Sequence, residues 1–120
     1  MLKPEEMLTP AQIEAFDVKY GADDYAIIRK PNRRTPTAFD WEVAIRRPDS
    51  VEYQLFKARI MKENTAARAN ELLIKTILIH PTLDALNEYQ KKWPGICDSS
   101  AVTSAVQELC GLASDELEKP

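Results

Sequence analysis

The chain of 120 residues has only one histidine, two cysteines and three glycines. One histidine and two cysteines are too few to build a closed zinc site without several carboxylates. The three isolated glycines form neither a dinucleotide-binding GxGxxG motif nor a Walker-type phosphate loop, and HExxH, CxxC and GxSxG are absent too. These absences exclude most metalloenzymes, and we predict no catalytic residues, no metal and no cofactor.

Long apolar runs are also missing. No stretch approaches the roughly 18 apolar residues of a membrane span, and the opening sequence MLKPEEMLTP lacks the apolar core of a signal peptide. Two cysteines in such a context are typical of a reduced protein. We therefore expect a cytoplasmic location, with Cys97 and Cys110 as small core residues rather than a disulfide or reactive thiols.

Neither sign of charge dominates, because 16 Lys and Arg oppose 19 Asp and Glu for a net charge of −3. The length fits one domain over residues 1–120, with residues 1–8 and 113–120 expected to fray. Residues 29–47 nevertheless hold six basic side chains: Arg29, Lys30, Arg33, Arg34, Arg46 and Arg47. Two interpretations stay open, a solvated face that pairs with the acidic flanks or a docking patch for an acidic partner or nucleic acid.

Capping signals organise the N-terminal half. Thr9 followed by Pro10 predicts a helix over 10–20, with Gly21 as its stop. Residues 25–30 are typical of a strand or an extended segment that Pro31 ends. Such a strand needs a partner, which the sequence does not identify.

Thr35 followed by Pro36 repeats this capping signal and predicts a helix over 36–46. Its apolar side chains fall on two faces, one with Phe39 and the other with Trp41. Such a helix is either sandwiched in the core, which makes Trp41 an ordinary core residue, or leaves one side for a partner. The second possibility makes Phe39 and Trp41 candidate binding residues.

Further helices are predicted over 51–63, 66–79, 83–92 and 99–112. The isoleucines near the end of the second of these leave a strand at 72–79 as an alternative. His80 then falls at a helix C-terminus, where a partial positive charge is favourable without any catalytic role. Together these elements predict a mainly α fold. We expect a compact bundle of four to six helices, with at most one short strand or hairpin near 25–30.

An ordered series of short sequences resembles the small tail assembly chaperones of tailed phages. The series runs IRKPNR at 28–33, NELL at 70–73, ILIHP at 77–81, LNEY at 86–89, WPGI at 93–96 and VQELCG at 106–111. The resemblance spans residues 25–112, although residues 35–64 have no counterpart in the pattern.

The resemblance implies a helical, non-enzymatic protein of the host cytoplasm. Such proteins bind the long helical tape measure protein and keep it soluble while the tail tube assembles. Helix-in-groove binding suits this role, and we expect an exposed apolar groove near Phe39, Trp41 and Phe56. The candidate partner-binding residues are Arg29, Arg33, Arg34, Phe39, Trp41, Arg46, Arg47 and Phe56.

Two other functions compete with this one. A structural virion component or interaction module would form a stable homo-oligomer. A nucleic-acid-binding domain would use Arg29 to Arg47, and its affinity would fall steeply with salt.

Overall fold

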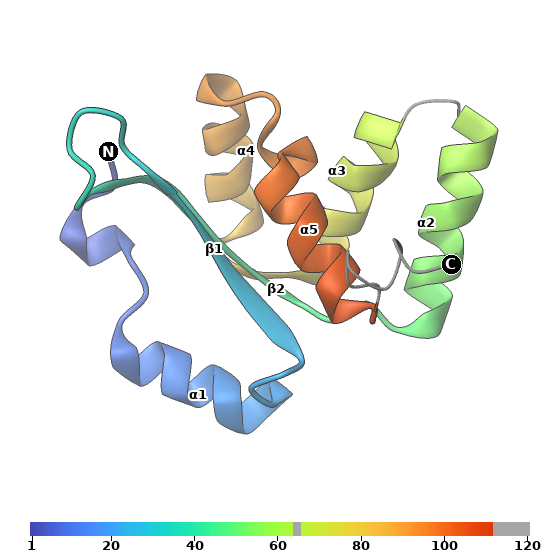
Figure 1. The fold of residues 1–120 in the computed structure, drawn as a ribbon, viewed down its shortest axis with the longest axis horizontal. Helices are drawn as coiled ribbons and strands as arrows, with labels where there is room; N and C mark the ends of the chain where they lie inside the picture. Colours follow the sequence, from blue (N-terminus) through green and yellow to red (C-terminus); the bar gives the residue numbers. More distant parts are fainter. Residues whose placement is uncertain (64–65, 112–120) are drawn as a thin grey trace, which may run out of the picture.

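The computed structural model describes residues 1–63 and 66–111. Over these residues, α-helices accompany a three-stranded antiparallel sheet of order β1-β2-β3 (Figure 1). The fold is therefore α+β, and the prediction of a mainly α bundle with one short strand is wrong. The elements are η1 (Pro4–Glu6), α1 (Pro10–Tyr20), β1 (Tyr25–Pro31), β2 (Phe39–Arg46), α2 (Ser50–Glu63), α3 (Ala66–Ile77), β3 (Leu78–His80), α4 (Leu83–Lys92), η2 (Ile96–Asp98) and α5 (Ser100–Leu109).

The largest correction concerns residues 36–46, which form a loop and strand β2 rather than a helix. Alternate side chains of β2 enter the main core, among them Trp41, Val43 and Ile45. This is the period of two that a strand imposes. The two apolar faces predicted for a helix are thus one face of a strand, and β-branched and aromatic residues favour that conformation.

The β1–β2 hairpin is closed by Asn32. Its side-chain oxygen accepts hydrogen bonds from the backbone N–H groups of Arg34 and Thr35, and its amide donates to Asp40 at 2.8 Å. Asn32 thereby satisfies loop backbone groups that a tight turn would leave unpaired. Pro36 lies in this loop and begins no helix.

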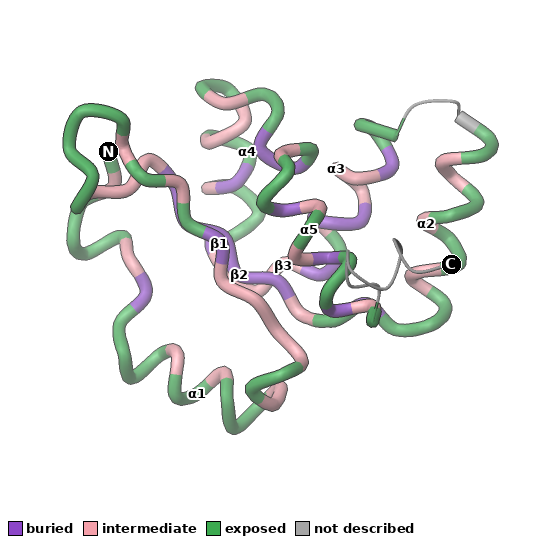
Figure 2. Tube along the Cα trace, viewed as in Figure 1, coloured by how far each residue is buried: buried purple, intermediate pink, exposed green. Residues whose placement is uncertain are grey.

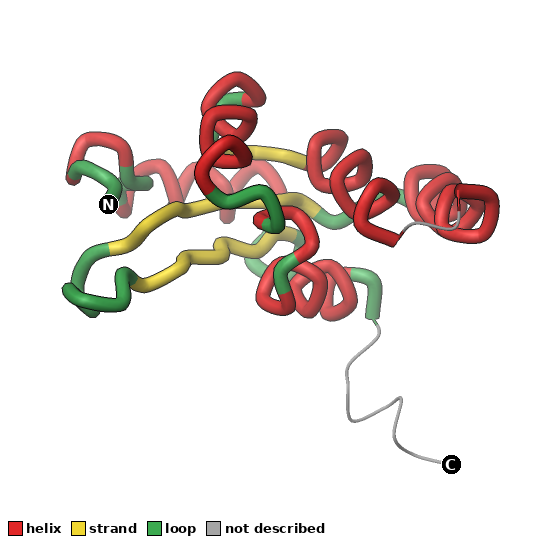
Figure 3. Tube along the Cα trace, turned by 90° about the horizontal axis from the view of Figure 1, so that it is seen from above, coloured by secondary structure: helices red, strands yellow, loops and turns green. Residues whose placement is uncertain are grey.

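Helix α3 ends at Ile77, two residues before the predicted end, and the chain continues as β3. Figure 3 shows this short strand on the far side of β2 from β1. His80 therefore lies in a strand, opposite Ala44 of β2, and not at a helix C-terminus. The explanation of His80 by a helix dipole is wrong.

The main core lies between the hairpin and helices α3, α4 and α5. Ile45, Ile77 and Leu86 are fully enclosed there. Figure 2 shows buried residues concentrated along β2, α3 and α5, while α1 and α2 are half-buried or exposed. Ile96 and Cys97 of η2 also enter this core, and Cys97 is thus the small core residue that the sequence predicts.

The N-terminal segment covers the other face of the sheet. Residues 1–8 are predicted to fray, whereas the N–H of Leu2 donates to the Phe39 carbonyl at 2.7 Å and Leu8 is buried. The N–H of Leu8 donates to Oε1 of Glu42, a carboxylate with no exposed surface. The segment is therefore attached to β2 at two points. The other end predicted to fray, residues 113–120, lies outside the described residues.

The remaining helices agree closely with their sequence signals. Thr9 and Gln12 form a capping box at the start of α1, and Gly21 ends it at a φ of 90°. Thr82 and Ser99 cap α4 and α5 through their side chains. Across residues 1–63 and 66–111, the structure contains no helix with the length and apolar character that crossing a membrane requires.

Candidate partner-binding groove

Helix α2 has apolar side chains that the rest of the fold leaves largely uncovered. None of its residues from Ser50 to Lys62 is buried. Val51, Leu55 and Met61 are 66%, 51% and 85% exposed. Single exposed apolar residues are normal on proteins, but three on one helix of 14 residues mark a surface suited to a partner.

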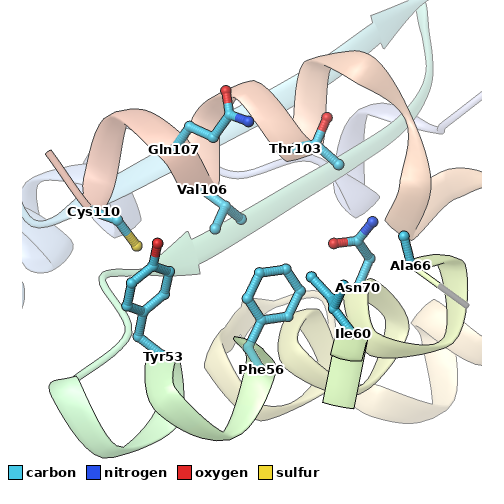
Figure 4. Close-up of a pocket in the computed structure, with 9 residues that line it drawn as sticks. All are labelled: Tyr53, Phe56, Ile60, Ala66, Asn70, Thr103, Val106, Gln107 and Cys110. Atoms are coloured by element: carbon cyan, nitrogen blue, oxygen red, sulfur yellow. The ribbon is translucent and has the colours of Figure 1, made fainter. Parts of the chain in front are cut away.

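A groove runs between α2 and α5, with a volume of about 270 Å³. Tyr53, Phe56 and Ile60 of α2 point across it toward Val106 of α5 and toward Cys110, which directly follows that helix (Figure 4). Its remaining walls are Ala66, Asn70, Thr103 and Gln107. The groove thus pairs an apolar floor with polar side chains at its walls.

The start of α2 is fixed to the end of β2 by Arg46. Its guanidinium donates two hydrogen bonds to the Glu52 carboxylate, at 2.8 and 2.7 Å. Glu52 and Asp49 also form a capping box through reciprocal bonds to each other's backbone N–H. The hydrogen bonds from Arg46 lower the pKa of Glu52 to about 2. These contacts orient α2 at its first turn.

The three predicted aromatic residues lie in different surroundings. Phe56 lines the α2–α5 groove. Trp41 is 3% exposed and belongs to the main core. This agrees with the alternative in which Trp41 is an ordinary core residue. The Phe39 ring lies under the Arg29 guanidinium, 5.6 Å from its centroid. The structure therefore does not bring the three together in one groove.

Most of the predicted arginines are engaged within the protein. Arg33 and Arg34 are exposed in the β1–β2 loop and form no ion pair with another described residue. The other three bond to acidic side chains at nitrogen–oxygen distances of 2.6–2.9 Å, in the pairs Arg29–Glu42, Arg46–Glu52 and Arg47–Asp24.

The basic segment is also divided in space. Arg33 and Arg34 precede β2, and Arg46 and Arg47 lie at its far end. Since a strand rises about 3.3 Å per residue, the seven steps from Phe39 to Arg46 separate these ends by roughly 23 Å. This arrangement gives little support to a continuous phosphate-binding patch and favours the interpretation of arginines paired with acidic flanks.

The groove has little capacity for chemistry. Its titratable groups are the Tyr53 hydroxyl and the Cys110 thiol. Burial raises the pKa of Cys110, which keeps the thiol protonated and weakly nucleophilic. Among residues 1–63 and 66–111, no three His, Cys, Asp or Glu side chains gather to hold a metal ion.

Sequence reasoning missed Val51, Leu55 and Met61 as surface residues. Val51, Leu55, Ala58 and Met61 recur at helical spacing, and such a stripe predicts an amphipathic helix over 51–63 whose apolar side faces a core. The signal that was available is the presence of apolar residues on several sides of α2, with Tyr53, Phe56 and Ile60 beside that stripe. One neighbouring helix cannot cover them all.

No family model, no curated protein and no solved structure matches this chain.

Proposed function

We propose that the protein is a non-enzymatic assembly chaperone of the phage tail type, acting in the host cytoplasm. In this proposal, α2 and the α2–α5 groove hold an apolar helical segment of a tape measure protein. The observation that supports it best is the apolar floor of the groove, where Tyr53, Phe56 and Ile60 of α2 face α5. The resemblance of the sequence to tail assembly chaperones supplies the partner.

The energetics suit temporary binding. An unsheathed tape measure chain exposes apolar helical stripes that would aggregate, and a groove that covers them prevents this. Each apolar side chain that becomes fully covered contributes about 1.5–3 kcal/mol. The exposed Gln107 amide at the wall can hydrogen bond to water when the groove is empty. The partner can then leave without exposing a dry cavity.

The experiment is co-expression with the very long helical protein encoded beside this chain, followed by affinity capture at about 0.15 M salt, where surface charge is largely screened. We expect the two proteins to be captured together. Phe56→Glu combined with Ile60→Glu should abolish capture, because it places two charges on the apolar floor of the groove.

Val18→Glu is the matched control. Val18 is 86% exposed and lies on α1, on the other side of the hairpin (Figure 1). Capture that survives the α2 double variant, or is lost equally in Val18→Glu, contradicts the proposal. So does a gene neighbourhood without a long helical protein. Stable self-association of the isolated chain through α2 would instead favour a homo-oligomeric structural component.

A further inference from the structure

Two adjoining hollows lie at the N-terminal end of α5, away from the α2–α5 groove. Their volumes are about 310 and 230 Å³, and they share Lys30, Trp41 and Ser99. We call them together the tryptophan basin. Trp93 lies in its wall, and Trp41 and Trp93 are the only tryptophans of the chain.

The basin is built by three separate parts of the fold. Lys30 of β1 pairs with Trp41 of β2 across the hairpin, so both side chains lie on the same face of the sheet. Trp93 follows α4, and Lys92 holds its ammonium 5.0 Å from the Trp93 ring centroid. Tyr89 supports that ring edge-on from the preceding turn. Both indoles therefore border one hollow, and the Lys92 ammonium lies against one of them.

The charge of the basin has one sign. Lys30 and Lys92 line it, and neither forms an ion pair with another described residue. Among residues 1–63 and 66–111, no acidic side chain lines either hollow. Asp98 is the acid nearest in sequence to Ser99, but the Asn70 amide bonds its carboxylate at 2.6 Å, outside the basin. Two unneutralised ammonium groups over an apolar floor are complementary to a carboxylate attached to an apolar group.

We propose that the tryptophan basin binds an acidic, leucine-bearing peptide segment of a protein partner. The apolar side chain of the segment lies against Trp93 and Pro94, over the exposed edge of Trp41. The carboxylates of the segment contact Lys30 and Lys92. The apolar floor favours a peptide over a free anion, because a free anion gains nothing from the indoles. This site is independent of the proposed function, since α2 takes no part in it.

The position of both tryptophans gives a direct assay. A synthetic peptide, acetyl-Glu-Leu-Asp-Glu-Leu-amide, is titrated into the full chain while intrinsic tryptophan emission and heat are recorded. We expect a saturable change at or below about 1 mM peptide, the weak end of specific recognition. An uncharged control peptide (the uncharged twin), acetyl-Gln-Leu-Asn-Gln-Leu-amide, in which amides replace the carboxylates, should bind at least tenfold more weakly.

Charge reversal locates the site. Lys30→Glu with Lys92→Glu should weaken binding at least tenfold. Gly95→Glu adds an acid at the rim, where a side chain meets no atom within 4 Å, and should weaken it about fivefold without disturbing the fold. The control is Lys91→Glu, the same charge change one residue away, since Lys91 pairs with Glu88 and does not line the basin.

Four results would overturn the proposal: no heat and no emission change, equal binding of the uncharged twin, equal weakening by Lys91→Glu, or full competition by inorganic phosphate at the peptide's own concentration. The last would show a simple anion site. Because Gly95→Glu and Lys91→Glu are surface changes, their results are interpretable even if the double lysine variant fails to fold.

Discussion

The Nε2 atom of His80 lies 3.6 Å from Oε1 of Glu42 and has no hydrogen-bond partner among the described residues. The same oxygen accepts the Leu8 N–H at 2.7 Å, and the other carboxylate oxygen accepts from Arg29 at 2.6 Å. One buried carboxylate thus joins β1, β2 and the N-terminal segment, with an uncharged imidazole beside it. The stability of this face of the sheet depends on the charge states of these groups.

Acid should destabilise the fold through His80. Burial lowers the pKa of His80 below its ordinary value of 6.5, more than the nearby Glu42 raises it. The unfolded chain therefore takes up a proton at a higher pH than the folded one, and stability falls as the pH drops below about 6.5. Urea unfolding between pH 5 and pH 8, at roughly half-unit steps, measures this slope. His80→Gln should flatten it, and an unchanged slope in that variant would assign the effect to another group.

Replacing Glu42 should separate its two roles. Glu42→Ala removes the partner of Arg29 and the acceptor of the Leu8 N–H, and we expect a loss of about 3 kcal/mol in the free energy of unfolding. Glu42→Gln keeps an acceptor oxygen and removes the charge, so the loss should be about 1–2 kcal/mol. Chemical denaturation measures both. Equal losses would mean that the hydrogen bond to Leu8 contributes nothing.

The Arg46–Glu52 pair should protect stability in moderate acid. Because the pKa of Glu52 falls from 4.5 to about 2 on folding, the pair contributes fully above about pH 4.5 and is lost as the pH falls toward 2. Glu52→Gln should cost about 1 kcal/mol at neutral pH, since both partners retain contact with water. Thermal unfolding of both proteins at pH 7 and pH 3 tests this, and a difference that is the same at both pH values contradicts it.

The two thiols should differ in reactivity. Burial raises the pKa of Cys97 to about 11, and Cys97 lies in the core, whereas Cys110 is half-buried at the wall of the groove. Iodoacetamide should therefore modify Cys110 first, as mass spectrometry of digested protein would show. A bound tape measure segment should slow modification of Cys110 and leave Cys97 unaffected. Protection of neither thiol by a captured partner would place that partner outside the groove.

The elements that sequence reasoning predicted well are those with local signals. Helix α1 has a cap, a proline at its first position and a glycine stop within 13 residues, so no distant contact is needed to define it. Strand β2 has none of these properties. Its conformation depends on pairing with β1 on one side and β3 on the other, and this pairing is invisible in the segment itself.

The candidate site shows the same limit. The sequence predicts Phe56 as a partner-binding residue, but its neighbours in the groove, Val106 and Cys110, lie 50 residues or more along the chain. The burial of Glu42 was equally hidden, because the Arg29 opposite it is known only once the strand register is known. Sequence identified the residue types, and the tertiary fold decided which of them are neighbours.

The lack of any buried residue in the first 13 positions of α2 has a consequence for its amide hydrogens. Opening this helix uncovers little apolar area, so its amides should exchange with deuterium long before those of β2. A partner that settles on α2 would then slow exchange there more than anywhere else in the chain. A weakly protected helix would then report directly on occupancy.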